Sequence, residues 1–218
     1  MRSLSISGAV SLLVLLANGV GAQDLAAFSP VPPPHQPSSP MQVFGAAEPP
    51  HGFVVFCHED PEECMATSNV DKPVAVSAER LRELDEVNRW VNQSITPETD
   101  FDHYGVNEYW TIPTDGKGDC EDYVLLKRHM LTQRGWPSSA LLITVVLDEH
   151  KEGHAVLTVR TEAGDLILDN KSKEIRLWSE TPYEFVMRQS SRNPRAWAYL
   201  EPAPDKAPTP IAVLRPQR

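Results

Sequence analysis

The sequence predicts an α+β domain with one layer of helices on an antiparallel sheet. Apolar side chains recur at helical spacing over residues 77–95 and again over residues 119–134. Three short runs of β-branched and apolar residues follow, at residues 140–147, 154–160 and 165–169. Because no helical segment separates these runs, we expect antiparallel strands in one sheet rather than alternating strands and helices.

The first helix, residues 77–95, has a polar cap and an apolar face. Ser77 can accept a hydrogen bond from an N–H group of the first turn. Charged side chains on the opposite side indicate a solvated face. We expect burial of the apolar stripe formed by Leu81, Leu84, Val87, Trp90 and Val91.

The second helix should begin at Asp119 and end before Gly135. Asp119 can cap it together with Asp122, three residues later, while Gly135 and Pro137 favour its termination. The preceding residues, 96–118, are rich in turn formers and aromatic side chains, which predicts an ordered loop.

The strand segments differ in pattern. Residues 140–147 form a continuous apolar run that suits a central strand. The next two runs are joined by residues 161–164, so Arg160 should pair with Asp165. Further strands are expected at residues 183–187 and 196–200.

The ends of the chain differ in composition from its middle. Residues 1–22 are expected to be a cleaved signal peptide, because an uncharged, mostly apolar stretch follows Arg2 and ends at small residues. This stretch is too short to span a bilayer, so we expect no membrane insertion after cleavage and a periplasmic or secreted protein. The other predicted parts are a proline-rich linker (23–50), one domain (51–200) and a flexible proline-containing tail (201–218).

Acidic residues outnumber basic ones, which gives a formal net charge of −10. A nucleic-acid-binding surface needs clustered lysine and arginine to neutralise phosphates. We therefore expect no nucleic-acid partner.

The cysteines fall into two kinds by their spacing. Cys57 and Cys64 lie close together in the sequence, and in an exported domain such a pair is expected to form a disulfide. The alternative is a metal site formed by this pair with His58, although one isolated cluster lacks the second ligand pair of a structural zinc module. Cys120 is then left as a free thiol.

Cys120 is the candidate nucleophile. In the first turn of a helix, the partial positive charge of the N-terminus stabilises a thiolate and lowers the cysteine pKa. The Cys120 N–H group has no intrahelical partner there, so it could donate to an oxyanion. The carboxylates of Asp119, Glu121 and Asp122 oppose thiolate formation, so a cationic partner is needed.

His154 is the candidate base and Asp169 the residue that orients it. Cysteine–histidine catalysis needs an imidazole to take the thiol proton and a third group to fix its tautomer. In the predicted hairpin Asp169 faces Val156, which makes it the diagonal neighbour of His154, about 7–8 Å away and within side-chain reach. This register favours Asp169 over Asp165. His103 is the rival base.

A resemblance to the bacterial transglutaminase-like cysteine peptidases rests on three motifs: GDCEDY at 118–123, HAVL at 154–157 and LDN at 168–170. The resemblance covers roughly residues 52–200. It implies a transglutaminase- and papain-like fold, with the nucleophile-bearing helix packed on the sheet. It also implies an exported cysteine endopeptidase that acts on protein or peptide substrates, such as cell-surface or envelope proteins, through a thioester. The family pattern assigns the triad to Cys120, His154 and Asp169.

Other interpretations stay open. The same triad could transfer the acyl group to an amine, as in a transglutaminase or amidase, or the domain could be a non-catalytic calcium- or peptide-binding module. The chemistry requires no cofactor, but Asp119 and Glu121 are candidate calcium ligands, with Asn170 or a nearby carbonyl. Some members of the resembled family bind calcium beside the nucleophile. Trp110 and Asn107 are candidates for a second oxyanion donor.

Overall fold

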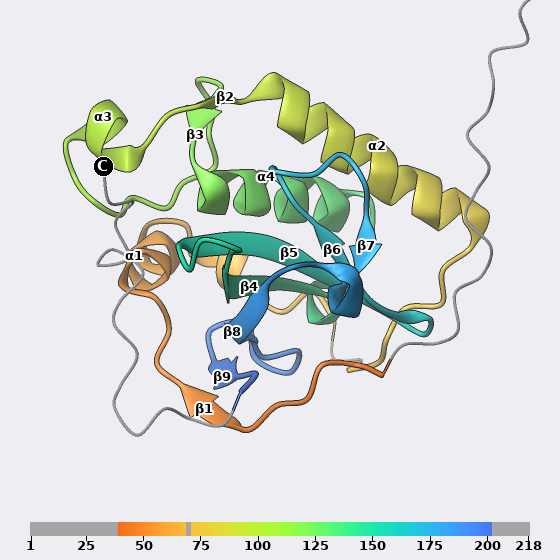
Figure 1. Ribbon diagram of the computed structural model, residues 1–218. Coiled ribbons are helices and arrows are strands. Elements are labelled where there is room, and N and C mark those ends of the chain that lie inside the picture. Colours follow the sequence, from red (N-terminus) through yellow and green to blue (C-terminus); the bar gives the residue numbers. More distant parts are fainter. Residues whose placement is uncertain (1–38, 69–70, 202–218) are drawn as a thin grey trace, which may run out of the picture. The chain divides into compact units, whose positions relative to one another are not determined.

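The computed structural model describes residues 39–68 and 71–201. These residues contain a seven-stranded antiparallel sheet (Figure 1). Its strand order is β1-β9-β8-β4-β5-β6-β7, and a short parallel pair joins β2 to β3. The helices are α1 (His51–Glu59), α2 (Ala78–Ser94), α3 (Asp100–Tyr104) and α4 (Cys120–Gln133). The strands are β1 (Gly45–Ala47), β2 (Thr96–Pro97), β3 (Lys117–Gly118), β4 (Leu141–Leu147), β5 (Gly153–Thr161), β6 (Gly164–Leu168), β7 (Arg176–Leu177), β8 (Glu184–Gln189) and β9 (Trp197–Tyr199).

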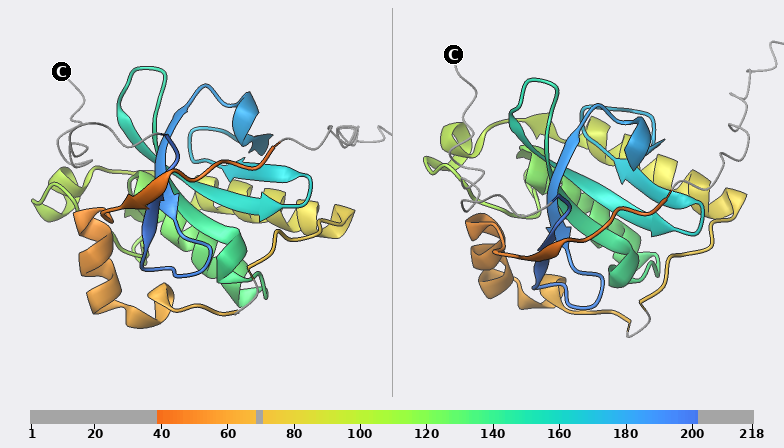
Figure 2. Two further views of the ribbon diagram at one scale, coloured as in Figure 1. Left: turned by 90° about the horizontal axis from the view of Figure 1, so that it is seen from below. Right: turned by 60° about the horizontal axis from the view of Figure 1, so that its bottom comes forward.

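Helix α4 lies along one face of the sheet, and α2 packs against α4 (Figures 1 and 2). Alternate residues of β5 point to opposite faces, so Leu157 and Val159 join the main core while Val156 joins a smaller cluster on the other face. The main core also contains Leu84 and Val87 of α2. This arrangement confirms the predicted α+β class and the predicted packing of the nucleophile-bearing helix on the sheet.

The two predicted helices are present within one residue of their expected starts. Ser77 caps α2 by accepting the Arg80 N–H at 3.2 Å. Trp90 departs from the prediction, because it is 51% exposed while Leu84 and Val91 are fully buried. The buried face of α2 is narrower than the predicted stripe, since α2 packs on another helix rather than on the sheet.

The predicted hairpin register is also present. Arg160 pairs with Asp165, and Thr161 pairs with Gly164. The connection is tighter than expected, with two residues between the strands rather than four. Gly164 has a φ of +124°, which a residue with a side chain rarely adopts, and this allows the strand to begin at once.

The folded domain begins earlier than predicted. Strand β1 lies inside the expected linker of residues 23–50 and pairs with β9, and the side chain of Met41 is buried. The Met41 N–H also donates to Asp165 Oδ2 at 3.1 Å. Proline excludes a helix or a central strand, but an edge strand needs backbone donors on one side only. The predicted signal peptide, and the tail beyond residue 201, lie outside the described residues.

Helices α1 and α3 were not predicted, because each is too short to show a clear helical period. The expected disulfide between Cys57 and Cys64 is present and links α1 to the 3₁₀ turn Pro61–Cys64. None of the helices in residues 39–68 and 71–201 combines the length and the apolar character that crossing a membrane requires.

Candidate active site

The imidazole of His154 and the carboxylate of Asp169 form a buried pair. The hairpin of β5 and β6 sets these residues diagonally across from each other, one near the start of β5 and one directly after β6. His154 Nε2 lies 2.9 Å from Asp169 Oδ1, and both side chains are almost completely buried. The contact expected from the register is therefore present.

Two further groups hold the Asp169 carboxylate. The hydroxyl of Tyr183 donates to Oδ2 at 2.5 Å, and the Lys171 N–H donates to Oδ1 at 3.0 Å. Burial alone would raise the pKa of Asp169, but the contacts with His154, Tyr183 and the Lys171 backbone hold it below its ordinary value. Tyr183 was missed in the sequence because it lies in the connection directly before β8, where no motif or strand register indicates what its side chain contacts.

Cys120 is the first residue of α4, and Asp119 is its N-cap, as predicted. The Asp122 carboxylate accepts the Asp119 N–H at 3.3 Å and the Thr111 N–H at 3.0 Å, which ties the helix start to the preceding loop. Gly118 packs closely against this carboxylate, and a Cβ atom at position 118 would lie 2.8 Å from the Asp122 Cβ. The close approach explains the glycine of the GDCEDY motif.

Gly118→Ala is expected to lower both the melting temperature and the reactivity of the Cys120 thiol. The added methyl group must displace Asp122 and with it the start of α4, at a cost of about 1–3 kcal/mol. Thermal unfolding followed by circular dichroism and the rate of thiol alkylation measure the two effects. Gly45→Ala is the control, since a Cβ there meets nothing within 4 Å. Similar losses in both variants would contradict this role of Gly118.

The thiol of Cys120 is turned toward a carboxyl group. Its Sγ donates to Glu121 Oε2 at 3.1 Å, and the N–H of Ala155 on β5 donates to the sulfur. Burial, followed by the negative charges of Glu121 and Asp119, raises the pKa of this thiol well above its ordinary value. The expectation of a low thiol pKa from the helix position is therefore wrong, because burial and the carboxylates outweigh the helix N-terminus.

The thiol contacts the strand that carries the histidine of this pair. Ala155, whose N–H donates to the sulfur, directly follows His154 in β5. Among the described residues no hydrogen bond joins the thiol to His154. Because the Nε2 atom of His154 is occupied by Asp169, the Nδ1 atom is the one left to act on a thiol.

Acidic side chains gather at the start of α4. Two groups, Asp119 with Cys120 and Glu121, and Asp119 with Asp100 and Asp122, each bring one ligand atom per residue within 4.8 Å of one another. One carboxylate oxygen of Asp100 and one of Asp119 are buried without a hydrogen-bond partner in the described part of the chain. Such a set of oxygens fits a hard divalent cation.

The charges in this cluster raise one another's pKa values. Burial and the nearby Asp119 raise the pKa of Asp100 to about 6 and that of Glu108 to about 7. Burial raises the pKa of Asp122 to about 8, and the charge of Asp119 adds to it. The sequence indicated Asp119 and Glu121 as ligands, with Asn170 or a nearby carbonyl, and the structure adds Asp100 and Asp122 to the cluster. Asp100 was missed because its closeness to α4 arises only from the folding of the loop.

The other predicted candidates have different roles. The indole N–H of Trp110 donates to Glu108 Oε2 at 3.0 Å, and its buried ring packs against Phe53, so it is occupied as a donor. Asn107 is exposed. His103 Nε2 lies 2.9 Å from Asp115 Oδ2, which holds this rival base within its own loop.

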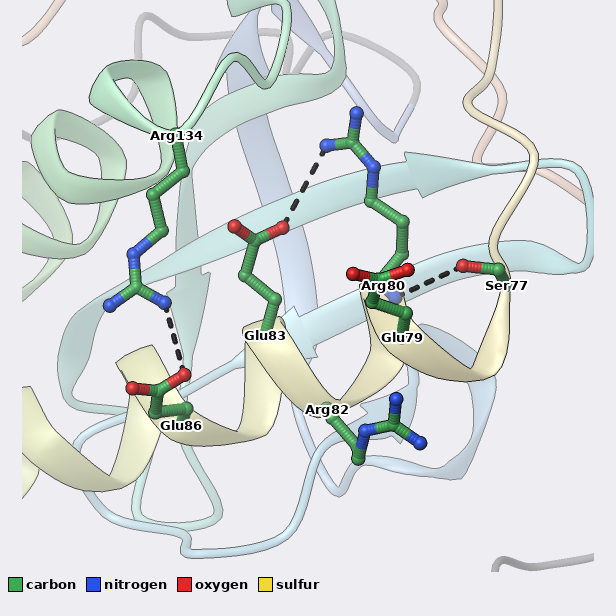
Figure 3. Close-up of a pocket in the computed structure, with 7 residues that line it drawn as sticks. All are labelled: Ser77, Glu79, Arg80, Arg82, Glu83, Glu86 and Arg134. Atoms are coloured by element: carbon green, nitrogen blue, oxygen red, sulfur yellow. Dashed lines mark hydrogen bonds and ion pairs between the residues drawn. The ribbon is translucent and has the colours of Figure 1, made fainter.

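A charged hollow beside the first half of α2 contains none of these residues (Figure 3). Its side chains largely pair with one another, with Arg80 Nη1 3.8 Å from Glu83 Oε2 and Arg134 Nη1 3.2 Å from Glu86 Oε2. We assign it no role in the candidate site.

A free thiol at a helix N-terminus, together with a buried histidine–aspartate pair on the antiparallel sheet that the helix packs on, is typical of cysteine-dependent acyl-transfer proteins. A family model described as "bacterial transglutaminase-like cysteine proteinase BTLCP" matches residues 43–205. The chain therefore belongs to this family, which confirms the family and the cysteine peptidase class expected from the motifs. No curated protein matches the chain.

Among solved structures, the fold is similar to Legionella pneumophila LapG. An EGTA-treated form has 32% identity and a TM-score of 0.44, and the match covers 50% of this chain and 62% of that chain. A calcium-bound form has 27% identity and a TM-score of 0.48, with 62% and 77% covered. In the EGTA-treated form, the match thus spans less than two thirds of the LapG chain.

Proposed function

We propose that this protein is an exported cysteine endopeptidase in which Cys120 is the nucleophile, His154 the base and Asp169 the residue that orients it. The observation that carries the proposal is the buried His154–Asp169 pair, whose histidine directly precedes Ala155, the residue that donates to the thiol at the start of α4. Membership of a cysteine proteinase family supports the reaction class.

The geometry supports a two-step hydrolysis. The Nδ1 atom of His154 takes the thiol proton while Nε2–H donates to Asp169, and the thiolate forms a C–S bond with the substrate carbonyl carbon. The imidazolium then protonates the leaving amine as the C–N bond breaks. Water attacks the thioester with His154 as base, which releases the acid and the thiol. The Cys120 N–H at the helix N-terminus is the proposed oxyanion donor.

We assign a calcium site to the acidic cluster, with Asp119 and Glu121 as ligands and Asp100 and Asp122 beside them. The two partnerless buried oxygens and the mutual repulsion of the carboxylates support a cation there. When bound, calcium would supply positive charge that favours the thiolate. It would also compete with the thiol for Glu121, the group to which the thiol now donates.

Export is supported by two independent features. The N-terminal residues 1–22 have the pattern of a cleaved signal peptide. The Cys57–Cys64 disulfide is typical of proteins that fold in an oxidising compartment. The proposed location is periplasmic or secreted, and the proposed substrates are protein segments, including those of cell-envelope proteins.

The function is tested by labelling Cys120 with a thiol electrophile and by mass spectrometry of a peptide library incubated with the protein and calcium. A peptidase creates new peptide ends. Mass additions at glutamine or lysine would instead show acyl transfer to amines. Cys120→Ser and His154→Ala should abolish the products, and persistence of new ends in both variants would overturn the triad.

A further inference from the structure

Tyr183 contacts both members of the buried histidine–aspartate pair. Its hydroxyl donates to Asp169 Oδ2 at 2.5 Å. Its ring meets the His154 ring edge to face, with the ring centroids 5.7 Å apart and the planes at 66°. A phenylalanine would make the same ring contact, so the hydroxyl is the part of this side chain whose role needs an explanation.

The hydroxyl of Tyr183 stays a donor. Burial, followed by the hydrogen bond to Asp169 and the charge of that carboxylate, raises the pKa of Tyr183, so the phenol keeps its proton. Hydrogen bonds to an ionised acceptor are roughly twice as strong as those between neutral groups. The ring of Tyr183 also packs against the smaller core cluster, which holds the donor in one direction.

The segment between β6 and β8, residues 170–183, contacts the Asp169 carboxylate at both of its ends. Near its start the Lys171 N–H donates to Oδ1 at 3.0 Å, and at its end the Tyr183 hydroxyl donates to Oδ2. The amide of Asn92 on α2 donates to the main-chain carbonyl of Asp169 at 2.8 Å. Both side-chain oxygens and the backbone of Asp169 therefore have fixed partners.

A cavity of about 30 Å³ lies beside this contact, and its lining includes Asp169, Thr181, Pro182 and Tyr183. A space of this size holds about one or two water molecules and is too small for a substrate side chain. Tyr183 therefore meets no substrate on this side, and its hydroxyl acts through Asp169. Without the hydroxyl, Oδ2 would have at most a mobile water as a donor in its place.

We propose that Tyr183 is a positioning residue of the active site, whose hydroxyl fixes the Asp169 carboxylate while its ring limits rotation of the His154 imidazole. The inference rests on the proposed triad. With both groups held, His154 keeps Nε2–H directed at Asp169 and Nδ1 available for the thiol proton.

Two substitutions separate the hydroxyl from the ring. Tyr183→Phe removes only the hydroxyl, and Tyr183→Leu removes the ring contact as well. With the full chain, calcium and a peptide identified in the library experiment, we expect Tyr183→Phe to lower kcat by about 10–100-fold, the worth of one hydrogen bond to a charged group. KM should stay unchanged, because the substrate does not touch this side chain. Tyr183→Leu should lower kcat further.

Tyr123→Phe is the matched control. It removes another tyrosine hydroxyl from the interior, one that donates to the Ile95 carbonyl at 2.9 Å. Both phenylalanine variants lose one internal hydrogen bond, so both should have a lower melting temperature. Only Tyr183→Phe should lose kcat per folded molecule, and an equal loss in both variants would overturn the proposal.

A spectroscopic measurement on the free protein needs no substrate. In protein with nitrogen-15-labelled histidine, the Nε2–H proton of His154 should resonate at low field and exchange slowly with water, because it is buried and bonded to a carboxylate. His154→Ala assigns this resonance by its loss. Tyr183→Phe should speed the exchange by roughly tenfold or more, whereas Tyr123→Phe should leave it unchanged.

The wild type offers a test even if Tyr183→Phe does not fold. The Tyr183 hydroxyl proton, assigned through its contacts with the ring protons, should also resonate at low field. Asp169→Asn should move it upfield, since a neutral amide is a weaker acceptor than a carboxylate. An unchanged His154 exchange rate in folded Tyr183→Phe, or a hydroxyl resonance that Asp169→Asn leaves in place, would overturn the proposal. A wild type that cleaves no peptide would refute only the peptidase function.

Discussion

Asp169→Asn is expected to lower turnover by roughly 10⁴-fold while the protein stays folded. The amide cannot stabilise the His154 imidazolium, and its N–H₂ group favours the wrong imidazole tautomer. Both carboxylate oxygens of Asp169 accept further hydrogen bonds, Oδ1 from the Lys171 N–H and Oδ2 from the Tyr183 hydroxyl. Asparagine has only one side-chain oxygen, so it can accept only one of these two hydrogen bonds. Steady-state cleavage of a peptide identified in the library experiment gives kcat and KM, and circular dichroism verifies the fold.

Asp165→Asn is the control for this substitution. The sequence register indicated that it would have little effect, but Asp165 is buried, lies 3.0 Å from Arg188 Nη1 and accepts the Met41 N–H. Loss of the Asp165 charge should lower the stability of the fold, because it leaves Arg188 unpaired. The pH profile of turnover by the protein that remains folded should not change. If the two variants lose the same fraction of kcat per folded molecule, Asp169 does not orient the base.

Chelator-treated protein is expected to lose stability as the pH rises from 5.5 to 8.5. The folded pKa values of Asp100, Glu108 and Asp122 are raised to about 6, 7 and 8. In the unfolded chain these groups titrate near 4. Between the unfolded and folded pKa values, the folded state therefore holds protons that the unfolded state has already released. This difference in bound protons stabilises the folded state at low pH, and the stabilisation is lost as the pH rises through the folded pKa values. Lys127 opposes this trend, because its lowered pKa favours the folded state at higher pH.

Calcium should reverse this loss. A tenfold change in a proton-binding constant corresponds to about 1.4 kcal/mol of stability, and each kcal/mol to roughly 2–4 °C in melting temperature. We therefore expect the melting temperature to fall by several degrees in chelator and to recover at pH 8.5 with excess calcium. Thermal melts at each pH measure this effect.

Glu108→Gln is the matched variant for the pH dependence. It should make the fall of the melting temperature with rising pH shallower. Asp119→Ala should remove the recovery, because Asp119 belongs to both groups of ligands. Chelated protein that is equally stable at both pH values would contradict the mutual repulsion of the carboxylates. A melting temperature at pH 8.5 that calcium leaves unchanged would contradict the cation site.

The sequence alone predicted the parts of the site that depend on local patterns. The cap residues and the apolar stripe located α4, and thus placed Cys120 at a helix N-terminus. Alternation within one short hairpin was enough to set Asp169 diagonally across from His154, since the register of a tight hairpin depends on only a few residues. The disulfide was predicted for the same reason, because both cysteines lie within one short segment.

Only the tertiary structure decided the groups whose contacts depend on the path of irregular connections or on packing between elements. Tyr183 reaches Asp169 from the residue before β8, and Asp100 reaches the start of α4 through the fold of the preceding loop. Lys127 has the sequence signature of an ordinary helix residue, and its burial depends on α2 covering α4. The thiol pKa likewise depends on burial and on charges brought together by folding, so the helix N-terminus alone gave the wrong direction.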